Sequence, residues 1–301
     1  AQLSVVAFVL VQLLAFSCHW FIAEPEVAVI TSNYLHWVAF AMPALVYSLV
    51  YRFICEGYSK LMPIIKVVVA LVVCNLVLNF FFLFGVGDIS GLGGAGCGLA
   101  TAVSACIVLF IIKTEVKKAV PEICQQPQMA ASWADSKELF LEGLPIGIAF
   151  VIEVLALTTL AFFFSSLCVK QVAAHQIAIN LAMVVFMLPL ALSSATTIRI
   201  AAFTEPQHRQ NRTNTAKAAL LMATLYGLAM VWALMSYGQS LLLAFSQDEH
   251  VLVLAAGLLI YVALFQFFDA IQIVAAGILR GLQQFVSPLL VLLIVYWFVV
   301  I

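Results

Sequence analysis

Charged residues are scarce in this chain of 301 residues. Lys, Arg, Asp and Glu make up 9% of the sequence, whereas 65% of its residues are hydrophobic and the mean hydropathy is +1.16. Ordinary soluble domains carry about 25% charged residues, so this composition excludes a soluble protein and predicts an integral membrane protein. The formal net charge is −1. Because the sequence offers no basic surface for phosphate groups, we exclude a nucleic-acid partner.

Motifs of metal-binding and catalytic sites are missing as well. The seven cysteines are scattered without a CxxC pair, and most lie in apolar runs. We therefore interpret them as small buried side chains rather than as metal ligands or disulfides. The sequence contains no HExxH motif, no paired aspartates of the intramembrane-protease type and no recognisable nucleophile-base motif. We expect neither an enzyme nor a bound cofactor.

Apolar runs long enough to cross a bilayer fill most of the chain. A membrane-spanning helix needs about 20 apolar residues. The sequence starts at Ala1 and stops at Ile301 inside an apolar run, so we expect it to be a fragment. The fold class is all-α, with eight complete helices and part of a ninth. The predicted spans are 3–23, 34–55, 62–86, 93–112, 141–166, 171–198, 215–245, 251–279 and a truncated one from 286.

The distribution of Lys and Arg predicts how the helices cross the membrane. If successive connections alternate between the two sides, twelve of the 13 Lys and Arg residues fall on one side and only Lys170 on the other. Cytoplasmic loops carry the excess of basic residues, which places the long polar stretch 113–139 in the cytoplasm. This stretch contains Pro121 and Pro127. We predict that it links two helical bundles.

Two carboxylates, Glu153 and Asp269, lie within predicted spans. An acidic residue at the centre of a membrane helix costs about 2.5–3.5 kcal/mol on insertion scales, so each should face the protein interior or a wet cavity. Glu153 is the thirteenth residue of its predicted span. At 1.5 Å per residue it lies about 18 Å from the start of the helix, near the middle of a core about 30 Å thick. The alternative is a hydrogen bond to a neighbouring helix without a transport role.

Polar side chains accompany the acids. Amides in membrane helices either bind a cation or ligand in a cavity or hold neighbouring helices together, and both interpretations stay open. They lie in groups spaced three or four residues apart, which places each group on one helix face. The groups are Gln266 and Gln272 on either side of Asp269, Gln176 with Asn180, and Asn75 with Asn79.

Two prolines, Pro43 and Pro189, interrupt predicted spans. A proline in a membrane helix releases a backbone carbonyl that neighbouring groups must satisfy. The two residues are candidate hinges, and static kinks are the equal alternative.

The chain also contains a short internal repeat. The second and eighth spans leave the membrane through residues 52–57 and 276–281, each ending in glycine, and then reach Pro63 and Pro288. Both exits lie on the predicted cytoplasmic side. A repeat in one orientation predicts two halves related by an axis along the membrane normal, which is a recurring plan of secondary transporters.

Several stretches in their order along the chain resemble the NorM-like branch of the multidrug and toxic compound extrusion (MATE) family. They are residues 56–57, 93–102, 143–145, 172–180 and 269–281. The resemblance implies a twelve-helix fold with two six-helix lobes, of which this chain would supply helices three to ten and the start of eleven. The implied parts are the remainder of the N-terminal lobe at 1–118, a linker at 119–139 and the C-terminal lobe at 140–301.

The resemblance also implies a function. Members of this branch exchange H+ or Na+ for cationic amphiphilic drugs, and a buried Glu and Asp in the C-terminal lobe hold the cation. By position these are Glu153 and Asp269, where Na+ is the only metal expected. Sodium-coupled relatives have a tyrosine where this chain has Phe265, which favours H+. The implied setting is a monomer in the bacterial inner membrane, with a small cationic amphiphile and the lipid bilayer as its partners.

The runner-up is a lipid-linked oligosaccharide flippase of the same wider superfamily. Its anionic pyrophosphate cargo would call for basic residues in the cavity. The only buried charges that the sequence indicates are acidic, which favours the antiporter.

Overall fold

The computed structural model describes residues 2–21, 24–86, 89–121, 132–165, 169–203, 208–245 and 248–295. Eight of the described helices are long and apolar enough to cross a membrane, which confirms the predicted number of complete spans. The helices and two short strands are α1 (Gln2–Phe21), α2 (Pro25–Gly57), α3 (Met62–Phe84), β1 (Gly85–Val86), β2 (Ile89–Ser90), α4 (Gly94–Ala119), α6 (Trp133–Ser165), α7 (Val169–Ala201), α8 (Arg209–Leu242), α9 (Glu249–Gly281) and α10 (Val286–Val295).

The observed helices extend beyond the predicted apolar runs into both ends of the polar stretch 113–139. Residues 113–119 continue α4, and residues 133–139 already belong to α6. These segments are rich in Lys, Glu, Ala and Leu, which are good helix formers, so the helix leaves the apolar layer without ending. Helix α2 also begins before its predicted span, at Pro25. A proline is compatible with this position because the first helical turn needs no backbone N–H. The middle of the linker, 122–131, lies outside the described residues.

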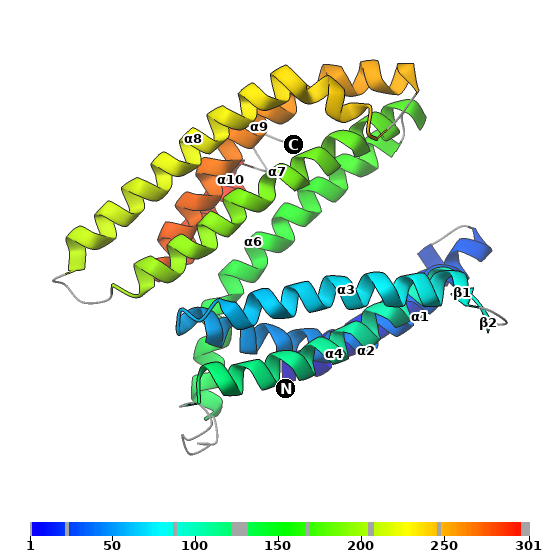
Figure 1. Ribbon diagram of the computed structural model, residues 1–301, viewed down its shortest axis with the longest axis horizontal. Helices are drawn as coiled ribbons and strands as arrows, with labels where there is room; N and C mark the ends of the chain where they lie inside the picture. Colours follow the sequence, from blue (N-terminus) through cyan, green and yellow to red (C-terminus); the bar gives the residue numbers. More distant parts are fainter. Residues whose placement is uncertain are drawn as a thin grey trace. The chain divides into compact units, whose positions relative to one another are not determined.

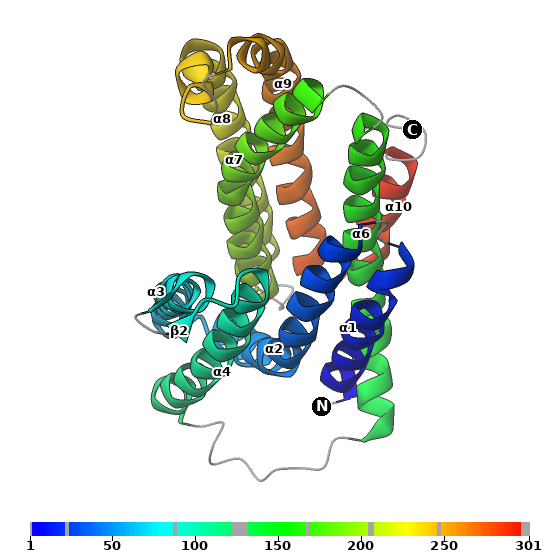
Figure 2. The same cartoon turned by 90° about the vertical axis from the view of Figure 1, so that its right-hand side faces the viewer.

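The chain divides into two compact units, residues 1–129 and 130–301. In unit 1, α2 packs against α1 and α4, and α3 packs against α4 (Figures 1 and 2). Gly98 of α4 permits the close approach of α2, because a Cβ there would lie 2.6 Å from the carbonyl oxygen of Tyr34. Small residues at helix contacts are the usual means of packing in membranes. Gly98, near the start of α4, thus serves helix packing.

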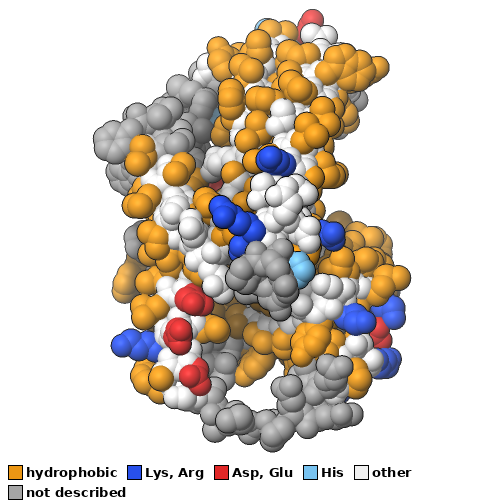
Figure 3. Space-filling model, turned by 90° about the vertical axis from the view of Figure 1, so that its left-hand side faces the viewer, with side chains coloured by type: hydrophobic (Ala, Val, Ile, Leu, Met, Phe, Trp, Pro, Cys, Tyr) orange, Lys and Arg blue, Asp and Glu red, His pale blue; other side chains and the backbone are white. Residues whose placement is uncertain are grey.

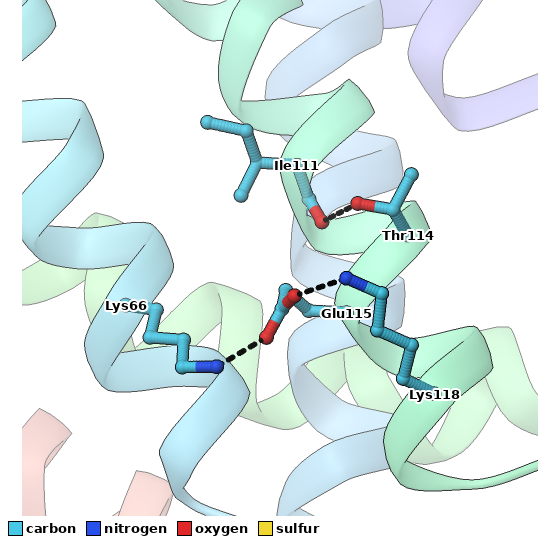
Figure 4. Close-up of polar contacts among 5 residues, drawn as sticks. All are labelled: Lys66, Ile111, Thr114, Glu115 and Lys118. Atoms are coloured by element: carbon cyan, nitrogen blue, oxygen red, sulfur yellow. Dashed lines mark hydrogen bonds and ion pairs between the residues drawn. The ribbon is translucent and has the colours of Figure 1, made fainter.

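A cluster of charges ties α3 to the end of α4. The carboxylate of Glu115 accepts hydrogen bonds from Lys66 at 2.7 Å and from Lys118 at 3.0 Å (Figure 4). Both lysines are exposed. This arrangement lets a half-buried carboxylate near the end of a membrane helix share two basic partners.

In unit 2, α9 packs along α7 and α8, while α6 pairs with α10 (Figures 1 and 2). Two hydroxyl groups of α7 bond across to the backbone of α9: Ser193 Oγ donates to the Ile273 carbonyl at 2.7 Å, and Thr197 Oγ1 donates to the Gly277 carbonyl at 2.8 Å. A Cβ on Gly277 would lie 2.7 Å from the Ser193 carbonyl oxygen. The two helices therefore approach too closely for any other residue at 277.

At the opposite end of α9, Asp248 caps the helix by accepting a hydrogen bond from the backbone N–H of His250 at 2.9 Å. That bond holds the pKa of the Asp248 carboxyl below its usual value, with Lys170 as a further cause. Lys170 lies 3.5 Å from the Asp248 carboxylate. The isolated basic residue and this acidic turn therefore share one end of unit 2, as the predicted topology requires.

The proline in α7 has a specific partner on α8. Pro189 lacks an N–H and leaves the carbonyl of Val185, one turn earlier, without its helical hydrogen bond. Tyr226 of α8 donates its hydroxyl to this carbonyl at 2.7 Å. Pro189 is fully buried. A neighbouring side chain thus satisfies the released carbonyl, while the hinge role of Pro189, and of Pro43 within α2, stays a prediction.

The internal repeat also appears in the backbone geometry at the ends of α2 and α9. Beyond Gly57, Ser59 has a φ of 55°, and beyond Gly281, Gln283 has a φ of 60°. The hydrogen bonds also match, because Lys60 N–H donates to Cys55 at 2.8 Å and Gln284 N–H donates to Leu279 at 2.9 Å. Both helices therefore end in the same left-handed cap, with residues 57 and 281 as equivalents.

Most of the surface is apolar. Figure 3 shows one face on which hydrophobic side chains predominate and charged side chains gather in a few places. Large side chains such as Phe16, Phe110 and Trp232 are well exposed on membrane-length helices. Exposed apolar side chains are favourable against lipid and unfavourable in water, so this surface fits a multi-pass membrane protein.

Tyr226→Phe should destabilise unit 2 by about 1–3 kcal/mol, because the Val185 carbonyl loses its donor in an apolar setting. In a Pro189→Ala background, the introduced alanine supplies the helical N–H, and the same tyrosine substitution should cost much less. Thermal unfolding of the two single variants and the double variant in detergent gives the coupling. Equal costs in both backgrounds would show that the tyrosine does not compensate for the proline.

Candidate functional site

Two cavities in unit 2 share the same pair of carboxylates. The larger has a volume of about 360 Å³ and the smaller about 40 Å³, enough for a water molecule or a small ion. Glu153 of α6 and Asp269 of α9 line both. Both side chains are half-buried. The two acids that the sequence singles out therefore lie at one place, between a large and a small space.

The helical rotation of α9 explains why Asp269 borders both cavities. Each residue turns the helix by about 100°, so a step of three residues turns it by about 60° in the opposite sense. Gln266 and Gln272 accordingly lie on either side of Asp269. Gln266 lines the larger cavity and Gln272 the smaller one.

The position of Glu153 follows from one face of α6. Ile146, Ala149, Phe150 and Glu153 all line the smaller cavity, at the spacing of residues that share a helix face. The apolar members face the cavity that residues of α9 and α10 also line, and Glu153 is the member of this face that carries charge. A carboxylate in this position faces a protein cavity instead of lipid, as its insertion cost requires.

A basic residue that the sequence analysis assigned to the cytoplasmic edge belongs to this site. Arg280, in the last turn of α9, lines the smaller cavity and interacts electrostatically with Glu153. Side chains on a helix lean toward its N-terminus, and arginine is long, so its guanidinium reaches back from the helix end. The expectation that all buried charges are acidic was therefore wrong. The spacing of eleven residues from Asp269, about three turns, was the available signal.

The larger cavity has an aromatic and thioether wall beside its acids. Phe265 is half-exposed and lines this cavity one turn from Asp269. Tyr261, which the sequence analysis did not select, lies one turn farther along the same face and supplies a hydroxyl that Phe265 lacks. Met183 and Phe186 contribute from α7. Aromatic and Met side chains suit a flat apolar ligand of variable shape.

The remaining predicted amides lie elsewhere. Gln176 donates to Asn180 at 3.3 Å, and both are exposed on a face of α7 next to the one that lines the larger cavity. In unit 1, Asn79 donates to Asn75 at 2.7 Å, and Asn75 donates to Ser104 at 3.2 Å. The asparagine pair thus links α3 to α4.

A family model described as MatE matches residues 145–301, more than half of the chain and nearly all of unit 2. The chain belongs to the MATE family. A probable multidrug resistance protein NorM from Acinetobacter baylyi is 30% identical over 303 residues, which cover 99% of this chain and 67% of the relative. The multidrug resistance protein MdtK of Proteus mirabilis is 31% identical over 91% of this chain. The chain spans 61% of that relative's length.

Solved structures show the same fold. A MATE protein in its straight conformation matches with a TM-score of 0.85 at 16% identity, over 98% of this chain and 66% of that one. A transporter of the MOP superfamily from Pyrococcus furiosus, with a binding pocket of reverse polarity, matches with a TM-score of 0.84 at 17% identity, over 96% of this chain and 65% of its own. The MATE fold thus accounts for both units.

Removing one partner of the Glu153–Arg280 pair should leave the other without its counter-charge. We expect Glu153→Gln and Arg280→Gln each to lower thermal stability, and the double variant to lose less than the sum. For a half-buried pair the coupling should be about 0.5–1 kcal/mol. Melting temperatures of the four proteins in detergent measure it. If the stability loss of the double variant equals the sum of the two single losses, Glu153 and Arg280 do not interact.

Proposed function

We propose that the complete protein is a secondary active multidrug efflux antiporter, which exchanges H+ or Na+ for cationic amphiphilic drugs. The observation that carries the proposal is the shared pair of carboxylates: Glu153 and Asp269 border both the drug-sized cavity and the ion-sized one. A drug and a coupling cation in these spaces would compete for one pair of negative charges. Such competition is the thermodynamic requirement for exchange.

The larger cavity supports the choice of drug class. Its wall is mostly aromatic and aliphatic, and its acids lie together at Glu153 and Asp269. A ligand with flat apolar rings and one positive charge would bury its rings against this wall and place its charge beside the carboxylates. The curated relatives in Acinetobacter and Proteus are named for multidrug resistance, which supports the same class.

The available energy suffices for export. One charge that crosses 100 mV releases about 2.3 kcal/mol, which sustains a drug gradient of roughly 50-fold at about 1.4 kcal/mol per tenfold. The coupling ion is proposed to be H+. Phe265 offers no hydroxyl to a sodium ion, although Tyr261 lies one turn farther from Asp269.

The charge balance of the site favours a cation over an anionic cargo. Two carboxylates and one guanidinium line the smaller cavity, which leaves a net negative charge when all three are ionised. A pyrophosphate-linked cargo would meet repulsion from both acids. Arg280 favours a flippase, because it could bind an anionic group. One basic residue does not make the net charge of the cavity lining positive.

The proposal includes a setting for the protein. We place the protein in the bacterial inner membrane as a monomer that needs no cofactor, with lobes at 1–118 and 140–301 and the intervening segment in the cytoplasm. The excess of Lys and Arg on one side supports this orientation.

Glu153→Gln and Asp269→Asn should each reduce drug efflux at least about tenfold, because an amide can neither exchange a proton nor neutralise a cation. Uptake of a fluorescent cation into everted vesicles of the complete protein measures this. Glu138→Gln, on an exposed part of the same helix, is the matched control and should transport normally. Normal efflux by both cavity variants would refute the site.

An imposed pH gradient should drive efflux, whereas an imposed Na+ gradient at constant pH should not. Reconstituted vesicles with each gradient in turn, and with the membrane potential clamped, separate the two ions. If Na+ alone drives transport, the coupling ion is sodium. The assignment based on Phe265 is then wrong.

A further inference from the structure

The side-chain amide of Gln266 is buried within unit 2. The residue is only 2% exposed, on the face of α9 that lines the larger cavity. Its amide nitrogen donates to the carbonyl oxygen of Ala182 on α7 at 2.9 Å. Its Oε1 has no hydrogen-bond partner among the described residues. A buried amide oxygen left in this state costs about as much as a lost hydrogen bond, so it calls for a partner.

The backbone of α7 fixes which end of the amide stays unpaired. A carbonyl oxygen accepts only, so the NH2 group of Gln266 must face Ala182. A rotated amide would bring two oxygens together. The group that Gln266 has left for a ligand is therefore an acceptor. Its place on α9 is one turn from Asp269 and next to Phe265.

We propose that Gln266 recognises the N–H group of a protonated amine substrate, so that this site prefers protonated primary, secondary and tertiary amines over quaternary ammonium ions. The inference rests on the proposed function, since it concerns the drug in the larger cavity. Both classes carry the positive charge that Glu153 and Asp269 attract. Only a protonated amine also brings an N–H that satisfies the amide oxygen.

The cavity supplies the rest of the geometry. The rings of the substrate would lie against Phe186 and Phe265, and its ammonium group would lie toward Asp269. Oε1 is itself buried, so the donor reaches it by displacing flexible side chains such as Met183, which lines the same cavity. A trimethylammonium head is too bulky to approach this oxygen and has no hydrogen to donate.

The test uses a matched pair of ligands on the purified, complete protein: an aryl-alkyl dimethylamine, protonated at neutral pH, and its trimethylammonium analogue. The wild type should bind the amine more tightly. Gln266→Met preserves the size of the side chain and removes the acceptor. It should weaken binding of the amine about tenfold or more and leave the trimethylammonium ligand nearly unchanged. Unchanged binding of the latter also shows that the variant is folded.

Two further variants make the outcome decisive. Gln266→Glu keeps an acceptor oxygen and should retain the preference for the amine, whereas Gln239→Met, at an exposed glutamine of α8, should behave as wild type. Equal weakening of both ligands, or of neither, in Gln266→Met would overturn the inference. So would a weaker competition by Na+ with no change in ligand preference, since Gln266 would then bind the ion. A wild type that binds neither ligand would instead refute the proposed function.

Discussion

The close contact of α7 with α9 is the constraint on which the site depends. Ser193 and Thr197 bond directly to the backbone of α9, and Gly277 removes the side chain that would separate the two helices. Bonds to backbone atoms fix how far one helix is shifted along the other, which packing of apolar side chains alone would leave adjustable. With this register set, the Ala182 carbonyl meets the Gln266 amide. Asp269, one turn farther along α9, lines both cavities together with Glu153 of α6.

Each polar group within the bilayer costs free energy unless it has a partner. In unit 2 the polar groups have different kinds of partner. The Val185 carbonyl released by Pro189 receives a hydroxyl from Tyr226. Glu153 has Arg280 near enough for electrostatic attraction. The Gln266 oxygen has no partner among the described residues. Asn79 Oδ1 of unit 1 is likewise without a partner among the described residues, but Gln266 also lines the cavity that contains the two acids. That position is why the Gln266 oxygen is the one that we assign to a ligand.

The sequence was sufficient for the helices and for the acids, and the reasons are physical. Twenty apolar residues in a row have one stable arrangement in lipid, so the number of complete spans followed from hydropathy. Glu153 and Asp269 stood out because an acidic residue within a membrane helix carries a large insertion cost. Helix ends were less predictable. The charged residues of 113–119 and 133–139 leave the apolar layer without leaving the helix.

Arg280 and the amides show where sequence reasoning stops. Hydropathy locates the Cα of Arg280 at a helix end, but the reach of its side chain depends on what lies behind it. Gln176 and Asn180 share a helix face, as their spacing requires, yet the face next to it lines the cavity. Which face of α7 turns inward is decided by its contact with α9, between residues 80 positions apart.

The site arises where the internal repeat breaks. The equivalent caps of α2 and α9 align Gly57 with Gly281, so Asp269 corresponds to Leu45 and Arg280 to Glu56. In α2 the acid at the helix end pairs within its own helix, with Arg52 at 2.7 Å. In α9 the basic residue at the equivalent position, Arg280, instead lines the smaller cavity together with Glu153 of α6. The two helices thus end in the same cap, and the acidic residue at the position equivalent to Leu45 gives α9 a carboxylate that α2 lacks.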